Sequence, residues 1–97
     1  MRDSPLTAQE RGDKARDLWE NEVFTEARQA VRQAILDTWA TSPVADKEGQ
    51  HELRLMLKLL NDLEANIQRV LADGQMAKVE IQRSTAEKAR RLIRGYL

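Results

Sequence analysis

Apolar residues recur at steps of three and four through the middle of the chain, which is the spacing of one side of an α-helix. Between residues 22 and 41 they form one stripe, made of Val23, Phe24, Ala27, Val31, Ala34, Ile35 and Trp39. Asn21 has a side chain suited to capping the first turn. Pro43 should end the helix, because the residue before a proline is pushed out of the helical region. The pattern therefore predicts a helix over about residues 22–41.

The longest pattern lies between residues 47 and 72 and has the spacing of a heptad repeat. Its expected contact positions, separated alternately by three and four residues, are Leu53, Met56, Leu60, Leu63, Ile67 and Val70. Four more leucines widen the stripe, Leu57 and Leu71 on one side and Leu55 and Leu59 on the other. This width exceeds the need of a two-stranded seam, so the first half of the helix should face two neighbours.

Capping residues mark both ends of this long pattern. Asp46 can cap its start. Asp73-Gly74 should end it, with Gly74 in the left-handed conformation that terminates many helices. We therefore expect the helix to cover about residues 47–72.

The N-terminal region predicts a shorter helix. Thr7 and Glu10 fit a capping box, which places a helix over about residues 8–20. Its apolar side consists of Ala15, Leu18 and Trp19. Ser4-Pro5 keeps the preceding residues extended, so residues 1–6 are expected to be flexible.

Residues 75–97 carry a less regular pattern. Residues 79–82 alternate as in a short strand, whereas residues 84–87 form a second capping box from which a helix would restart at Thr85. We favour helix for most of the segment, because a lone strand leaves its backbone hydrogen-bonding groups unpaired. The alternative is a strand over about residues 77–82, which would need another copy to pair with it.

These elements predict an all-α fold. Its centre would be an antiparallel helical hairpin of residues 22–41 and 47–72, with a short N-terminal helix and a basic C-terminal helix. A chain of 97 residues is expected to form a single domain. No stretch reaches the roughly 18–20 apolar residues that a membrane-spanning helix needs, so we expect no membrane partner.

Charge divides the chain although the total is zero. Residues 1–74 hold ten basic and fourteen acidic residues, a net charge of −4, and residues 75–97 hold six and two, a net charge of +4. The basic residues that could contact phosphates or an acidic partner include Arg83, Lys88, Arg90, Arg91 and Arg94. Such a tail can dock on the acidic part of another copy or on a different partner, or bind nucleic acid, or remain a solvated helix face.

The residue types that carry catalysis are sparse. His51 is the only histidine and there is no cysteine, which leaves no usual zinc site. The four glycines are scattered along the chain, so no loop is suited to cradle a phosphate. We therefore expect no enzymatic activity, no metal and no cofactor.

Several apolar residues lie outside the stripe that a hairpin would cover. Trp39 is an interface candidate because tryptophan is enriched at binding hot spots, and Leu55 and Leu59 because soluble monomers rarely expose large apolar patches. The apolar side of the tail adds Leu92, Ile93 and Tyr96. We therefore expect a homo-oligomer or a subunit of a larger protein assembly.

Five short segments carry a resemblance to a known class of proteins. Residues 18–27 read LWENEVFTEA, and they are followed by DKE at 46–48 with HELR at 51–54, LKLL at 57–60, and DG at 73–74. In this arrangement residues 15–80 resemble small helical proteins that tailed bacteriophages encode among their virion head genes. The resemblance implies a non-enzymatic component of a particle or of its assembly, located in the virion or in the cytoplasm of the infected bacterium. It carries over no functional residue.

The sequence favours an oligomeric structural or assembly protein. One alternative is a small helical adaptor or inhibitor that docks on a host or phage protein. Another is a nucleic-acid-binding protein that uses the basic tail. The mass in solution separates the first two, and the salt dependence of binding identifies the third.

Overall fold

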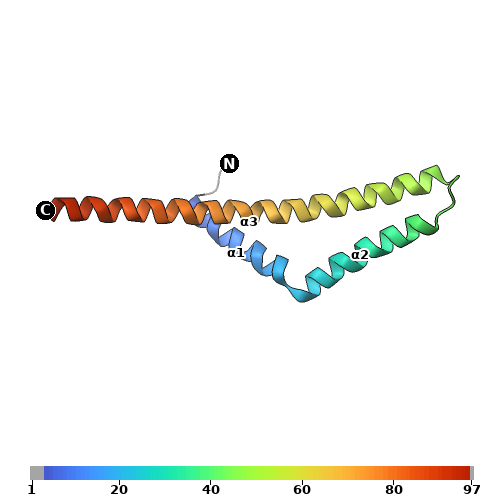
Figure 1. Cartoon of the computed structure of the whole chain (residues 1–97), viewed down its shortest axis with the longest axis horizontal. Coiled ribbons are helices and arrows are strands. Elements are labelled where there is room, and N and C mark those ends of the chain that lie inside the picture. The colour runs from blue at the N-terminus through green and yellow to red at the C-terminus, as the bar shows by residue number, and fades with distance from the viewer. Residues whose placement is uncertain (1–3, 97) are drawn as a thin grey trace. The chain divides into compact units, whose positions relative to one another are not determined.

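The computed structural model describes residues 4–96, and this part of the chain is all-α, as predicted (Figure 1). It contains the helices α1 (Pro5–Glu20), α2 (Glu22–Thr41) and α3 (Lys47–Tyr96), with no strand among the described residues. The bounds of α2 and the start of α3 match the prediction.

Side-chain caps fix the starts of α2 and α3. The Asn21 side chain accepts a hydrogen bond from the backbone N–H of Phe24 at 2.9 Å. Asp46 does the same for the backbone N–H of Gly49 at 3.0 Å. Both predicted N-caps are confirmed, because each satisfies a donor that the first turn of a helix leaves unpaired.

The start of α1 differs from the prediction. Ser4 caps this helix, since its Oγ accepts a hydrogen bond from the backbone N–H of Thr7 at 3.3 Å. Pro5 occupies the first helical position, where its fixed φ fits and its missing N–H leaves no bond unmade. Thr7 therefore lies inside the helix, and α1 begins three residues earlier than expected. Pro5 and Leu6 of the segment expected to be flexible are helical, and residues 1–3 of that segment lie outside the described residues.

The predicted end of the third helix at Asp73-Gly74 is wrong. The helix α3 continues through both residues and is 50 residues long. None of the described glycines has a positive φ, so Gly74 is not a left-handed cap. The second start predicted at Thr85 is also wrong, and residues 77–82 are helical rather than a strand. The reason for a glycine inside this helix is its neighbour in α1.

The contacts separate into two compact units, and the expectation of a single domain stays a prediction. The first unit comprises residues 4–16 and 69–96, and the second comprises residues 17–68. Both α1 and α3 contribute to each unit.

The first unit is held by a close approach of two helix backbones. A Cβ atom placed on Gly12 of α1 would lie 2.6 Å from the Cα of Gly74 in α3, and the converse distance is also 2.6 Å. Ala15 and Ala77 are buried in the same unit. Beside this contact, Lys78 Nζ forms an ion pair with Asp13 Oδ1 at 2.9 Å. Gly74 is therefore needed for the helix crossing, because only a residue without a side chain leaves room for the facing backbone.

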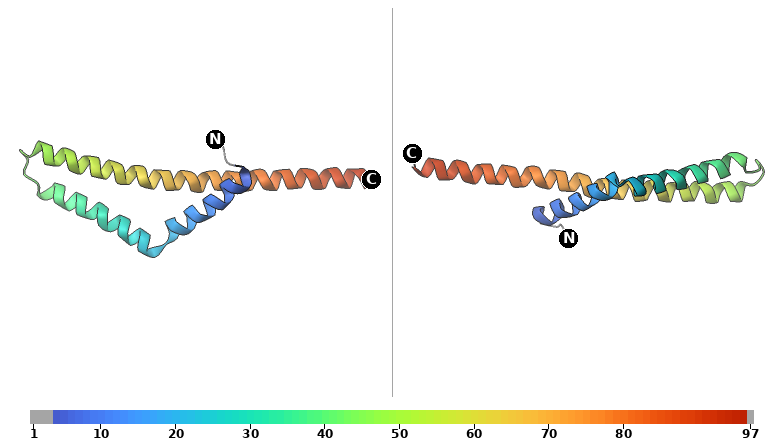
Figure 2. Two further views of the ribbon diagram at one scale, coloured as in Figure 1. Left: turned by 180° about the vertical axis from the view of Figure 1, so that it is seen from behind. Right: turned by 90° about the horizontal axis from the view of Figure 1, so that it is seen from below.

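The second unit pairs α2 with residues 47–68 of α3, which Figures 1 and 2 show side by side. Its buried apolar residues are Ile35 and Leu60. Arg28 contacts Glu64 and Arg32 contacts Asn61, so rising numbers on α2 meet falling numbers on α3. The two segments therefore run in opposite directions within this unit.

The contact side of α3 is shifted from the predicted one. Its buried or half-buried positions in the second unit are Gly49, Gln50, Leu53, Leu57, Leu60, Glu64 and Ile67, and the last five form its contact side. Leu63 of the predicted seam is 52% exposed and Met56 is 51% exposed, whereas Leu60 is 8% exposed. Glu64 takes the place expected for Leu63, because two arginines of α2 pair with its carboxylate.

The contact side of α2 is shifted in the same way. Its buried or half-buried positions are Phe24, Thr25, Arg28, Arg32, Ile35 and Leu36, of which Phe24, Arg28, Arg32 and Ile35 define the contact side. The residues expected in the buried stripe but found exposed are Val23, Ala27, Val31, Ala34 and Trp39.

We predict that Gly12→Ala destabilises the protein, although alanine is the better helix former by about 1 kcal/mol. The new methyl group would meet the Gly74 backbone, which cannot rotate away as a side chain can. We expect the free energy of unfolding to fall by about 1–3 kcal/mol and the melting temperature by several degrees in a circular dichroism melt.

Gly95→Ala is the matched control, because no heavy atom lies within 4 Å of a Cβ placed there. This change should leave the melting temperature unchanged or raise it slightly. Equal effects of the two substitutions would contradict the proposed role of the glycine contact.

Candidate interaction surface

The predicted interface residues of α2 and the first part of α3 all reach the surface. Trp39, in the last turn of α2, is 55% exposed, and Leu59 of α3 is 69% exposed. Leu55 is exposed as well. Their exposure satisfies one requirement of an interface, and their role as an interface stays a prediction.

The predicted residues of the tail lie in the last turns of α3. Leu92 and Ile93 are exposed, and the side chain of Tyr96 lies outside the described part of the structure. All five predicted basic residues are exposed. With about 100° of rotation per residue, Arg83, Arg90 and Arg94 share one side of the helix. The other two, Lys88 and Arg91, point away from the centre of this stripe.

A charged cluster that the sequence reading missed fixes the contact between α2 and α3. The guanidinium of Arg28 lies 3.9 Å from the ring centroid of Trp19 and 5.3 Å from that of Phe24. Its Nη1 donates to Glu64 Oε2 at 2.9 Å, and the two side chains are only 13% and 17% exposed. Arg32 adds an ion pair with Glu64 and a hydrogen bond to Asn61 Oδ1 at 2.8 Å.

This cluster, which we call the clamp, joins α2 to α3. The Arg28 charge is stabilised on both sides, by the aromatic faces and by the Glu64 carboxylate. Its Nε is buried without a hydrogen-bond partner among the described residues. A sequence signal existed, because Phe24, Arg28 and Arg32 follow one another at steps of four on one side of α2.

Seven exposed apolar residues of the second unit lie one position before a residue of the contact side, as Val31 precedes Arg32 and Leu59 precedes Leu60. Other exposed apolar residues of this unit, such as Trp39 and Leu55, lie elsewhere. We call the set of seven the outer apolar face: Val23, Ala27, Val31 and Ala34 of α2, with Met56, Leu59 and Leu63 of α3. One step back along an α-helix is a rotation of about 100° away from the contact.

The two halves of the outer apolar face lie on the same side of the helix pair. Two antiparallel helices are related by a two-fold axis perpendicular to the plane that contains both helices. Rotation about this axis exchanges the helices, and it keeps every residue on its own side of that plane. The same backward step on both helices therefore leads to the same side, whereas in a parallel pair it would lead to opposite sides. The second unit consequently has one continuous apolar face beyond its own core.

The opposite side of the second unit is polar. The residues one position after the contact side are Thr25, Gln29 and Gln33 of α2 and Arg54, Lys58, Asn61 and Gln68 of α3, with Leu36 and Ala65 as the apolar exceptions. The pair of helices is therefore amphipathic as a unit, because one outer side suits water and the other suits a partner.

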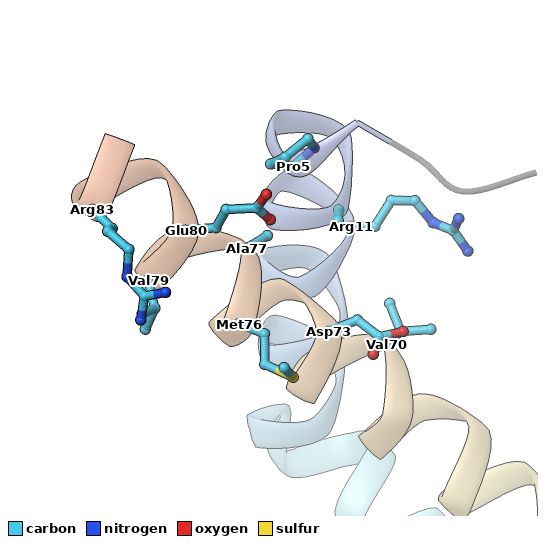
Figure 3. A pocket seen from close by; sticks show the side chains of 10 residues that line it. Pro5, Arg11, Val70, Asp73, Met76, Ala77, Val79, Glu80 and Arg83 are labelled. Carbon is cyan, nitrogen blue, oxygen red and sulfur yellow. The ribbon is translucent and has the colours of Figure 1, made fainter. Parts of the chain in front are cut away.

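Two grooves lie next to these surfaces, one in each unit. The groove of the second unit has a volume of about 530 Å³ and is lined by Trp39, Ile35 and Leu53, with His51 at its rim. The groove of the first unit has a volume of about 840 Å³ (Figure 3). It is lined by apolar residues such as Met76 and Val79 and by acidic and basic side chains.

The larger groove offers no preorganised chemistry. Arg11 and Arg83 line it together with Asp73 and Glu80, so its charges balance. Figure 3 shows the Glu80 side chain extending from α3 towards the first turns of α1, while the neighbouring Val79 and Arg83 side chains extend away from α1 in this view. Within residues 4–96, no three side chains of His, Cys, Asp or Glu come close enough to hold a metal ion. None of the helices in this range is both long and apolar enough to cross a membrane.

Comparison with known proteins adds no assignment, since no protein-family model, curated protein or solved structure matches the chain.

We predict that Glu64→Gln destabilises the second unit. The substitution keeps the shape of the side chain but removes the charge that balances Arg28 and Arg32 at a site with little water. We expect a loss of about 1–3 kcal/mol, less than for a fully buried pair because some solvent reaches the cluster. Urea unfolding followed by circular dichroism measures it.

Asp62→Asn is the control on the same helix. Asp62 pairs with Lys58 at 2.9 Å, but both side chains are exposed, so its removal should cost less than about 1 kcal/mol. A loss for Glu64→Gln as small as that for Asp62→Asn would show that the cluster does not hold α2 to α3.

Proposed function

We propose that the chain is a non-enzymatic assembly protein that acts by binding further copies of itself. In this proposal α2 and the first part of α3 form an antiparallel hairpin that serves as the body of the subunit. The basic end of α3 provides a second attachment point.

The observation that carries the proposal is the amount of surface left uncovered. The chain exposes 8126 Å², whereas a compact monomer of 11.1 kDa exposes about 5,700 Å². Much of the exposed surface is apolar, with Val23, Leu59, Met76 and Leu92 among the large side chains in water. A monomer rarely carries so much apolar surface, and association would cover it.

The resemblance to phage proteins of the virion head region gives this proposal a biological setting. We propose that the protein belongs to a phage particle or to its assembly, in the virion or in the cytoplasm of the infected bacterium. The support for this setting is the sequence resemblance over residues 15–80. A protein of this kind needs no catalytic site, because its activity is the geometry with which its copies bind.

Nucleic-acid binding is a second candidate, favoured by the stripe of Arg83, Arg90 and Arg94. Guanidinium groups on one side of an exposed helix suit a phosphate backbone. The same side also carries Glu87, which weakens the attraction. An adaptor that docks on a host or phage protein is the third candidate and rests on the same apolar surface as self-association.

Self-association predicts a mass that exceeds 11.1 kDa and rises with concentration. Light scattering after gel filtration, from low to high micromolar protein, measures it. A chain that stays monomeric and helical throughout would contradict the assembly proposal and favour the adaptor.

Arginine removal tests the second candidate in the same preparation. If the tail binds nucleic acid, Arg90→Gln with Arg94→Gln should weaken binding to duplex DNA and reduce its salt dependence, since two phosphate contacts would be lost. If the tail has no such role, the wild-type protein should bind DNA no better than this variant does.

A further inference from the structure

The outer apolar face of the second unit is larger than a single exposed residue can explain. Its seven residues include five large side chains, all at least half exposed: Val23, Val31, Met56, Leu59 and Leu63. These side chains expose on the order of several hundred Å² of apolar surface per copy. Two such faces in contact, with their polar rims, would bury on the order of 1,000 Å², which is the level at which specific interfaces become stable.

We propose that this face binds the same face of a second copy, so that the two helix pairs form an antiparallel four-helix bundle. This inference rests on the proposed self-association and adds which surface performs it. The arrangement needs a two-fold axis that lies in the interface, parallel to the helices, as in a closed symmetric dimer.

The shape of the face favours a second copy as its occupant. The α2 half carries the smaller residues of the face, Val23, Ala27, Val31 and Ala34. The α3 half carries large residues, namely Met56, Leu59 and Leu63. The two-fold axis places α2 of one copy over α3 of the other, so that large side chains meet smaller ones. A face of this kind is complementary to itself, which is the requirement for a two-fold interface.

The charge of the face favours the same occupant. None of its seven residues is charged, so two copies can approach without placing like charges opposite each other. Arg54, Lys58 and Asp62 lie outside the face, whereas Glu52, which also precedes a residue of the contact side, lies at its end on α3. A different protein would be selected by complementary charge at the centre, and none is present there.

The contacts within one copy set which residues meet across the interface. Arg32 lies level with Asn61, and Arg28 lies level with Glu64. Rotation about an axis parallel to the helices does not change the height of a residue along the bundle. Val31 of one copy should therefore meet Leu59 and Leu63 of the other. Ala34 of one copy should also contact Leu59 of the other copy, on the side of Leu59 that faces away from Val31.

The first test introduces a charge at the centre of the face. Leu59→Lys should raise the dissociation constant of self-association at least about tenfold, measured by sedimentation equilibrium. Its helical content should not change, because Leu59 is 69% exposed and lies outside the core. Gln29→Lys is the matched control on the polar side, and it should associate as the wild type does.

The second test uses the absence of cysteine from the chain. Separate single-cysteine variants, Ala34→Cys and Leu59→Cys, are mixed and oxidised, so that any disulfide between them joins two copies. We expect a crosslinked heterodimer in high yield. The control mixture, Gln33→Cys with Arg54→Cys on the polar side, should yield little.

The outcomes separate this inference from the proposed function. A wild-type oligomer that Leu59→Lys leaves intact, with no excess crosslinking of the face pair over the control pair, overturns the bundle and leaves assembly through another surface. A wild-type protein that is monomeric at high micromolar concentration overturns both. Dissociation by Leu59→Lys together with specific crosslinking supports both.

Discussion

Two helices packed together bury only the side of each that faces the other, and the rest of this protein follows from that constraint. In the second unit the contact side is a narrow stripe centred on Leu60 and Ile35. The buried apolar residues of residues 4–96 are Ala15, Ile35, Leu60 and Ala77, and two of these are alanines. Such a core is too small to account for the apolar content of the chain, which stands at 41%. The proposed self-association would cover apolar residues that this core leaves exposed.

The units meet the constraint in different ways. In the first unit the helices approach until the backbones of Gly12 and Gly74 touch, so contact is made with almost no side-chain volume. In the second unit the helices are held by a charged cluster around Arg28 and Glu64, which fills contact positions that apolar residues would otherwise occupy. Leu63, whose expected place Glu64 takes, is left on the outer apolar face.

Sequence reasoning succeeded where the determinant is local. Asn21 and Asp46 cap their own helices through bonds to residues three positions on, so a short window contains the whole signal. It failed at Gly74, because the role of this glycine is set by Gly12, which is distant in the sequence. The motif Asp-Gly is typical of a helix end, and no residue near it in the sequence indicates that the backbone of another helix faces Gly74.

The contact side of α3 was misassigned for a related reason. A rule that places apolar residues inside and charged residues outside selects Leu63 over Glu64, and the partners that reverse this choice lie on another helix. Leu53, Leu60 and Ile67 of the predicted seam do lie on the contact side. Met56 and Leu63 are exposed, and the residues that follow them, Leu57 and Glu64, take their places. The candidate surface was therefore found only in part: Leu59 was expected at the surface, whereas Val31 and Met56 became visible once both helices were in place.

The position of Arg28 over Trp19 gives the chain a built-in optical reporter. The two tryptophans differ in environment, since Trp19 lies against a guanidinium at 3.9 Å while Trp39 is largely in water. Trp19 emission depends on whether the Arg28 clamp is closed, and Trp39 emission depends on solvent at the far end of α2. In a chain that carries Phe in place of Trp39, fluorescence would follow the opening of the clamp alone, without an attached dye and at concentrations low enough to separate folding from association.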